Sequence, residues 1–250
     1  MTRQFLPIIF NKEINLSIQK IYLLHFLRLY MNKEEQIKKR TKLINELLEM
    51  GIKNEKVINA IRKIPREKFV AEDQKDYAYE NIPLSIPSNQ TISQPYTVAY
   101  MIELLEIKRG NKILEIGTGS GYNATLLKTL AGKNGEVYSI EIIEELNLQA
   151  KENLKNAKIK DVNLILGDGN LGYKEKAPFD RIIITAATKH IPKNLIDQLK
   201  DGGIFVAPIE KSGSYQVMTK IIKKDGRLIT TEHGLFNFVP MTISSDHQNK

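Results

Sequence analysis

The stretch Ile113-Leu114-Glu115-Ile116-Gly117-Thr118-Gly119-Ser120-Gly121-Tyr122 decides the fold of this chain. An apolar run passes into a glycine-rich turn and a helical pattern follows at once, which predicts a buried strand, a tight turn and a helix. Glycines allow positive φ and let the backbone approach a ligand without a Cβ in the way. The dinucleotide fingerprint G-x-G-x-x-G would need a glycine at position 122, but that residue is Tyr122, which disfavours a nicotinamide dinucleotide. A tight turn without a ligand is the alternative interpretation.

Short apolar runs alternate with helical stretches after this turn. We predict strands over residues 112–116, 136–141, 163–166, 180–185 and 203–208, and helices over residues 122–131, 143–157 and 192–199. Strands and helices alternating at this spacing form a parallel sheet covered on both faces. Two further strand-like runs, joined by Lys224-Asp225-Gly226, predict an antiparallel hairpin over residues 215–223 and 227–233. The predicted fold class is α/β, a doubly wound, Rossmann-like sheet that ends in a C-terminal hairpin.

Helices are predicted before the sheet. The spacing of apolar residues predicts one helix from Lys33 to a stop at Gly51 and a second over residues 55–64. Residues 66–94 are rich in Pro, Asn, Ser and Tyr and predict an irregular, lid-like segment. Pro95 then opens another helix, at a position where its missing N–H costs nothing.

The first 30 residues form an atypical extension. Their apolar stretch over residues 18–30 is interrupted by polar and charged side chains and is shorter than the roughly 20 residues of a membrane span, so we expect no membrane association. Three interpretations stay open: an amphipathic helix docked on the core, a surface anchor, or upstream sequence before a true start at Met31. We favour the last, or a loosely attached helix, and we expect residues 31–250 to form a single domain.

Composition excludes several kinds of chemistry. The chain has no cysteine, which rules out disulfides, thiolate zinc sites and a cysteine nucleophile and suits a cytoplasmic location. Its four histidines are scattered with no pair at ligand spacing, so no metal site is expected. The formal charge of +8 would suit nucleic acid, but the lysines are interleaved with acids and no aromatic-studded basic stripe is present. We therefore expect no nucleic-acid partner.

Acidic residues stand at the ends of the next two predicted strands. Glu141 ends the strand after the glycine turn, where a carboxylate can accept both ribose hydroxyls of an adenosine; its alternative role is that of an acid at a helix N-terminus. Gly167-Asp168-Gly169 ends the third strand, which would place Asp168 beside an adenine, or else forms an ordinary Asp-Gly turn. Ligands bind outside the carboxyl ends of parallel strands. The three strand ends together therefore predict one adenosine-binding site.

The segment Asn89-Gln90-Thr91-Ile92-Ser93-Gln94-Pro95 precedes the helix that leads into the first strand. It can therefore fold over the same crevice. Its small hydroxyls and amides suit recognition of a carboxylate through neutral hydrogen bonds. Capping of the helix by Ser93 or Gln94 is the alternative role, and Ser93 can serve both.

With these residues in place, the chain resembles the protein-L-isoaspartate O-methyltransferases over about residues 31–242. The segment Thr91-Ile92-Ser93-Gln94-Pro95 and the late Phe238-Val239-Pro240 are much more specific to this family than the glycine turn, which many methyltransferases share. The extension before Met31 has no counterpart in the family, and the tail after Pro240 is weakly matched. The other segments that carry the resemblance are Arg66-Glu67-Lys68-Phe69-Val70, Tyr77-Ala78-Tyr79, residues 115–123, Val137-Tyr138-Ser139-Ile140-Glu141, Gly167-Asp168-Gly169 and residues 178–187.

The resemblance implies a class I methyltransferase fold and S-adenosyl-L-methionine as cofactor. It implies that Ser93 is the catalytic serine beside the methyl group and the isoaspartyl carboxylate. The implied substrate-binding residues are Thr91, Ile92, Ser93 and Val239. The implied cofactor-binding residues are Glu115, Gly117, Thr118, Gly119, Ser120, Gly121, Glu141, Asp168 and Gly169.

The implied activity is methyl transfer to the free α-carboxylate of L-isoaspartyl residues in damaged proteins, which initiates repair to aspartate through a succinimide. We expect a cytoplasmic monomer whose partners are isoaspartyl-containing proteins and peptides. The main alternative is a methyltransferase of the same fold that acts on RNA or a small molecule. An RNA enzyme usually adds an RNA-binding module or an amide-donating motif after the fourth strand, where this chain has Thr185-Ala186-Ala187-Thr188. A nicotinamide-dependent oxidoreductase and a binding-only protein are weaker alternatives.

Overall fold

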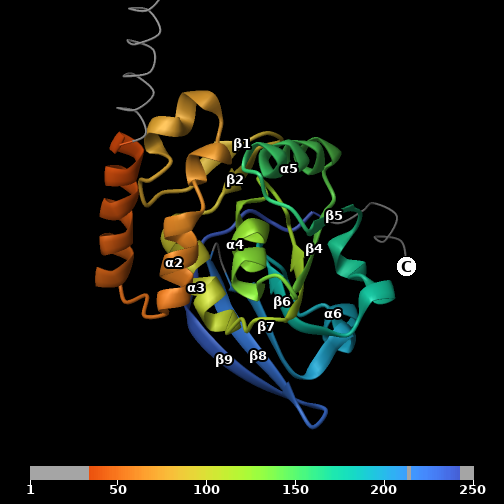
Figure 1. Ribbon diagram of the computed structural model, residues 1–250. Helices are drawn as coiled ribbons and strands as arrows, with labels where there is room; N and C mark the ends of the chain where they lie inside the picture. The colour runs from red at the N-terminus through yellow and green to blue at the C-terminus, as the bar shows by residue number, and fades with distance from the viewer. Residues whose placement is uncertain (1–33, 213–214, 243–250) are drawn as a thin grey trace, which may run out of the picture. The chain divides into compact units, whose positions relative to one another are not determined.

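A seven-stranded sheet carries the fold of residues 43–250 in the computed structural model, which describes residues 34–212 and 215–242 (Figure 1). The strands from β5 to β7 are parallel, and β8 and β9 are antiparallel to their neighbours. The predicted doubly wound sheet with a C-terminal antiparallel hairpin is confirmed. From one edge to the other, the strands are β5 (Val162–Leu166), β4 (Glu136–Glu141), β3 (Lys112–Ile116), β6 (Phe179–Ile184), β7 (Leu199–Ser212), β8 (Tyr215–Lys224) and β9 (Arg227–Phe236).

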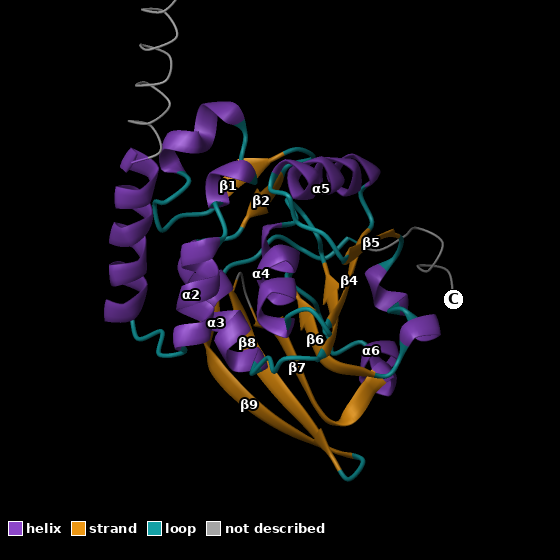
Figure 2. Ribbon diagram, viewed as in Figure 1, coloured by secondary structure: helices purple, strands orange, loops and turns teal. Residues whose placement is uncertain are grey.

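Apolar side chains cover both faces at the centre of the sheet, because successive strand residues point to opposite sides. Ile113 of β3 lies in a buried cluster with residues of α2 to α5, whereas its neighbour Leu114 lies in a second cluster with Leu195 of α6. The central parallel strands β3, β4 and β6 are therefore buried from both sides, as this sheet type requires. The helices labelled in Figure 2 are α2 (Glu55–Lys63), α3 (Pro95–Leu105), α4 (Tyr122–Ala131), α5 (Glu144–Asn156) and α6 (Lys193–Gln198).

Predicted and observed elements agree best in the parallel half of the sheet. The strands over residues 112–116 and 136–141 and the helix over residues 122–131 have the predicted ends, because each apolar pattern there is bounded by a turn. The strand predicted over residues 203–208 is longer, since β7 begins at Leu199 and pairs along the length of β8. That pairing depends on residues far along the chain.

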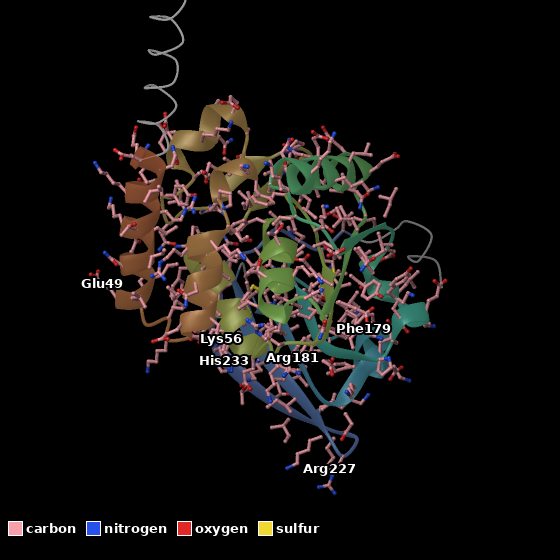
Figure 3. All side chains as sticks on the ribbon, viewed as in Figure 1. Glu49, Lys56, Phe179, Arg181, Arg227 and His233 are labelled. Atoms are coloured by element: carbon pink, nitrogen blue, oxygen red, sulfur yellow. The ribbon has the colours of Figure 1, made fainter. Side chains whose placement is uncertain are left out.

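A two-residue turn joins β8 to β9. Lys224 pairs with Arg227, and the residues between them, Asp225 and Gly226, have φ of 50° and 73°. Positive φ at both central positions is typical of the turn that matches the twist of a hairpin. Figure 3 shows Arg227 at the outer end of this hairpin.

The chain divides into two units, residues 1–42 and 43–250. A helix runs over residues 34–49 and ends before Gly51, as predicted. The extension proposed for residues 1–30 lies outside the described residues. Within the described ranges, no helix combines the length and the apolar character that a bilayer span demands.

Residues 66–94 are more regular than predicted. They contain 3-10 helices at Arg66–Lys68 and Glu72–Tyr77 and a two-stranded antiparallel hairpin, β1 (Leu84–Ile86) and β2 (Gln90–Ile92). The prediction of an irregular segment was wrong here. Each strand has only three residues, too few for an alternating pattern to stand out. Burial of Leu84, Ile86 and Ile92 against the domain stabilises the hairpin.

Candidate active site

A cavity lies where the strand order reverses. β4 lies on one side of β3 and β6 on the other, and ligands bind outside the carboxyl ends of the strands at such a point. Residues 117–120, 141–143, Gly169 and Thr185 line the cavity, and they follow or end β3, β4, β5 and β6 respectively. The predicted convergence of strand ends is therefore present in the structure.

The β1–β2 hairpin forms another wall of this cavity through residues 90–92. Its tip is tied to α5, because Ser88 Oγ donates a hydrogen bond to Glu145 Oε2 at 2.7 Å. Figure 1 shows the hairpin beside α5 at this end of the sheet. Ile86 of β1 reaches the glycine turn, with its Cδ1 atom 3.5 Å from the place of a Cβ on Gly119. The segment predicted to act as a lid thus contacts the turn directly.

The glycine turn runs from Gly117 to Gly121. Gly117 has a φ of 95°, and a Cβ there would lie 2.4 Å from Thr185 Oγ1. That hydroxyl donates to the carbonyl oxygen of Gly117 at 2.7 Å. Backbone conformation and close approach therefore both require glycine at this position.

Glu141 holds the turn in place and also lines the cavity. Its side chain is buried, with Oε2 accepting the backbone N–H of Gly119 at 2.9 Å and Oε1 accepting that of Ile143 at 3.0 Å. The role at the start of the helix is therefore present, and the contact with ribose hydroxyls stays a prediction. The carboxylate supports the start of α5, and its remaining lone pairs can accept hydroxyl groups of a ligand.

Glu115 and Gly121 flank and end the glycine-rich stretch. Glu115 is completely buried and accepts hydrogen bonds from Asn123 Nδ2 at 2.7 Å and Ser139 Oγ at 2.5 Å. Burial raises the pKa of Glu115 to about 7, although both hydrogen bonds act in the opposite direction. A Cβ on Gly121 would lie 2.6 Å from Leu154 Cδ1, so this glycine lets α5 pack closely. Neither residue belongs to the cavity lining.

Asp168 and Gly169 follow β5. Asp168 Oδ1 accepts the backbone N–H of Asn170 at 2.9 Å, so the carboxylate caps a short 3-10 helix. Gly169 lines the cavity, whereas Asp168 lies outside the lining. A Cβ on Gly169 would lie 2.2 Å from Ile116 Cγ2, which explains why a glycine is needed beside the end of β3. The contact of Asp168 with an adenine stays a prediction.

Ser93 follows β2 and is half-buried. The N-cap residue of α3 is Gln94, and no side chain of the N-cap residue makes a capping hydrogen bond there. Asn81 Oδ1 accepts the backbone N–H of Tyr96 at 3.0 Å instead, and Gln94 Nε2 donates to the carbonyl oxygen of Asn81 at 2.9 Å. Asn81, which precedes the hairpin, thus accepts a free N–H group at the start of α3, and Ser93 does not cap the helix.

Four residues border two hollows at once. The cavity described above and a second, larger groove share Thr91, Ser93, Thr185 and Val239. Three of them, Thr91, Ser93 and Val239, were predicted to bind substrate. Ile92 is buried and lines the cavity but not the groove. The shared residues form a junction at which groups held in the two hollows can meet.

Thr185 and the chain near residue 240 were not predicted to act together. Ala187 donates its N–H to the Val239 carbonyl oxygen at 2.8 Å, and Met241 donates to the Ala187 carbonyl oxygen at 2.8 Å. These bonds hold Val239 beside the junction. Thr185 follows β6, so it could have been predicted from its place at the end of a parallel strand, as the residues at the ends of β3, β4 and β5 were. No local sequence pattern predicts that Ala187 pairs with residues 239–241.

Charge is nearly absent from the cavity. Among the described residues that line it, Glu141 is the single acidic or basic side chain. No group of three His, Cys, Asp or Glu side chains within the described ranges could hold a metal ion. The cavity therefore suits an uncharged or cationic ligand with hydroxyl groups.

Comparison with known families gives a match over residues 38–246 to the model described as Protein-L-isoaspartate(D-aspartate) O-methyltransferase. Among curated relatives, the Protein-L-isoaspartate O-methyltransferase of Ignicoccus hospitalis is 47% identical over 204 residues, which are 82% of this chain and 97% of that protein. The protein of the same name from Pyrococcus horikoshii is 44% identical over 213 residues, which are 84% and 96% of the two chains.

Solved structures with similar folds include proteins of the same name. A structure titled protein-L-isoaspartate O-methyltransferase superposes with a TM-score of 0.74 at 32% identity over 80% of this chain, and the match spans 65% of that longer chain. A Plasmodium falciparum protein described as a beta-aspartate methyltransferase, crystallised with S-adenosyl-L-homocysteine, superposes with a TM-score of 0.70 at 28% identity. That match covers 80% of this chain and 97% of the other.

Proposed function

The chain belongs to the protein-L-isoaspartate (D-aspartate) O-methyltransferase family, and we propose that it methylates the free α-carboxylate of L-isoaspartyl residues in damaged proteins. The methyl donor is S-adenosyl-L-methionine. Methylation initiates repair to aspartate through a succinimide. Within the family, the observation that carries the assignment to these residues is the junction at Ser93, where the two hollows meet.

The cavity fits the methyl donor chemically. The buried Glu141 carboxylate can accept ribose hydroxyls, and its negative charge is favourable near a cationic ligand. Thr118 and Ser120 offer hydroxyls, and the turn at Gly117 brings the backbone to the cavity wall. When bound, S-adenosylmethionine supplies an electrophilic methyl group on a sulfonium sulfur. We assign cofactor binding to Gly117, Thr118, Gly119, Ser120, Glu141 and Gly169, and contact with the adenine to Asp168. Glu115 and Gly121 do not line the cavity, and we assign them to the support of the glycine turn.

The acceptor carboxylate needs no general base. Its unperturbed pKa is around 3 to 4, so it is ionised at neutral pH and is already nucleophilic. Ser93 hydrogen-bonds this carboxylate and orients it without transferring a proton, and Thr91, Ile92 and Val239 line the same place. Alignment of reacting groups can contribute on the order of 7 kcal/mol or more in favourable cases.

Water must be excluded, because the charge of the carboxylate is neutralised as the new bond forms. Residues 81–94 supply this cover. Their hairpin is fixed by the Ser88–Glu145 hydrogen bond and by the packing of Ile86 on the glycine turn. A dry site strengthens each hydrogen bond within it.

The methyl ester product reacts further without the enzyme. The backbone amide nitrogen of the next residue attacks the ester carbonyl carbon, methanol leaves, and a succinimide ring closes. The attack is favourable because it is intramolecular. Hydrolysis of the ring converts the damaged residue to normal aspartate in a fraction of the substrate molecules.

The test is transfer of a labelled methyl group to matched isoaspartyl and aspartyl peptides. Label should enter the isoaspartyl peptide alone; equal labelling of both peptides, or of neither, would refute the proposal. Ser93→Ala should lower kcat/KM, while Ser85→Ala, an exposed hydroxyl on the same hairpin, should leave it unchanged. A structured RNA offered in parallel tests the main alternative, since labelling of RNA would favour it.

We further propose that the enzyme is a cytoplasmic monomer that acts without nucleic acid or membrane. The interleaving of lysines with acids argues against nucleic acid, and the lack of cysteine suits a cytoplasmic location. Sedimentation analysis at several protein concentrations tests the oligomeric state.

A further inference from the structure

A groove with aromatic walls adjoins the junction. It is lined from α3 by Tyr96 and Tyr100, and from β9 and the residues after it by His233, Phe236 and Phe238. All five rings are half-buried, so part of each is open to the groove. Figure 3 shows His233 on β9, on the side of the sheet where α3 lies.

Four of these rings form a continuous row. The ring centroids of Tyr96 and Tyr100 are 5.7 Å apart with an interplanar angle of 16°, and those of Tyr100 and Phe236 are 5.7 Å apart at 21°. Phe236 and Phe238 continue the row at 6.4 Å and 48°. Ring pairs at these separations are stabilised by their quadrupoles. The row therefore forms a wall of fixed shape that could pack against another ring.

The groove carries little charge. Among the described residues that line it there is no Asp, Glu, Lys or Arg. Burial, with a smaller effect from Lys220, lowers the pKa of His233, so its imidazole is neutral at pH 7. A charged side chain placed here would lose hydration without gaining an ionic partner. An aromatic side chain would bury apolar surface instead, and a phosphate backbone would find no cation.

The groove begins where the isoaspartyl residue is expected. It shares Thr91, Ser93, Thr185 and Val239 with the cofactor cavity. Tyr96 lies three residues after Ser93, and Tyr100 lies one helical turn further, about 6 Å along α3. Two residues of an extended peptide span roughly 7 Å. A neighbour within two residues of the isoaspartate can therefore reach Tyr100.

We propose that Tyr100 and Phe236 form a specificity subsite that binds an aromatic side chain of the substrate within two residues of the isoaspartate. This inference rests on the proposed function. It adds a sequence preference: an aromatic neighbour lowers KM, and a charged neighbour in the same position raises it.

The experiment uses short peptides with a central isoaspartate and Tyr, Leu, Ala, Lys or Glu at each position from two before it to two after it. At one position we expect Tyr to lower KM about threefold to tenfold relative to Ala, as an aromatic pair would. Tyr100→Leu and Phe236→Leu should each bring the Tyr and Leu peptides to the same KM and leave kcat on the Ala peptide within about twofold. Tyr77→Leu, an exposed ring outside the groove, should keep the preference.

Two results would overturn the subsite. One is equal KM for all neighbours with the unaltered enzyme, and the other is an aromatic preference that survives in both groove variants. Binding of S-adenosylhomocysteine to each variant shows that it is folded, and the two variants are independent of each other. Failure of the proposed function is distinct, because no isoaspartyl peptide would then be methylated whatever its neighbours.

Discussion

The carboxylate of Glu141 at the end of β4 accepts the backbone N–H of Gly119, 22 residues earlier in the chain, at 2.9 Å. This bond fixes the glycine turn against the neighbouring strand. The same carboxylate lines the cavity in which we propose that the cofactor binds.

Glu141→Gln should therefore weaken cofactor binding. The amide loses the charge and one of the two acceptor oxygens, and hydrogen bonds to charged groups contribute about 1.5 to 3 kcal/mol. The dissociation constant for S-adenosylhomocysteine, measured by calorimetry, should rise roughly tenfold to a hundredfold. Glu136→Gln, at the exposed opposite end of β4, is the matched control. Equal affinities of the two variants would contradict the role of Glu141.

Gly169→Ala should disturb both stability and binding, whereas Gly167→Ala should not. A Cβ at position 169 would lie 2.2 Å from Ile116 Cγ2, and one at position 167 would meet nothing within 4 Å. Overpacking of this kind costs about 1 to 3 kcal/mol. Urea unfolding should show that loss for Gly169→Ala and a change within about 0.5 kcal/mol for Gly167→Ala. A similar loss in both variants would mean that space beside β3 is not the cause.

Glu115→Gln should change how stability depends on pH. Burial raises the pKa of Glu115 from 4.5 to about 7, so between these values the folded protein keeps a proton that the unfolded chain releases. Stability then falls as pH rises through this window, by about 3 kcal/mol at most. A neutral glutamine escapes this loss, so the variant should gain stability relative to the parent between pH 5 and pH 8.

The glutamine can keep the local hydrogen bonds. Ser139 Oγ and Thr118 Oγ1 are 2.6 Å apart and either can be the donor, so Ser139 can accept from the new amide and donate to Thr118. Thermal unfolding at a series of pH values measures the difference. Glu49→Gln removes an exposed carboxylate and controls for the loss of one negative charge. A parallel pH profile for Glu115→Gln and the parent would rule out the raised pKa.

Arg66→Ala should destabilise the protein strongly. The side chain is completely buried, its Nε donates to the Ala78 carbonyl oxygen at 2.9 Å, and its guanidinium lies 5.4 Å from the ring centroid of Tyr122. Loss of a charged donor and of this packing should lower the free energy of unfolding by about 3 kcal/mol or more. Arg62→Ala, an exposed arginine on α2, should change it by less than about 0.5 kcal/mol. Equal effects in urea unfolding would show that burial of Arg66 contributes little.

Much of the cavity at the strand ends could be predicted because its signals are local. A strand, a glycine turn and a helix occupy adjacent residues, and Glu141 ends the next strand. In parallel sheets, the carboxyl ends of the strands lie at the same edge, independently of the structure elsewhere in the chain. Within that set, only packing separates Gly117, which lines the cavity, from Glu115 and Gly121, which do not.

The glycine turn, the alternation of strands and helices and the C-terminal hairpin were thus determined by the sequence itself, since periodicity and turn chemistry act over a few residues. The short β1–β2 hairpin, the capping of α3 by Asn81 and the tie between Ala187 and Val239 were decided only by the tertiary structure. So was the aromatic groove, where Tyr100 meets Phe236 across 136 positions of the chain. Such contacts form because folding buries apolar surface and pairs polar groups between distant segments, and no local pattern records them.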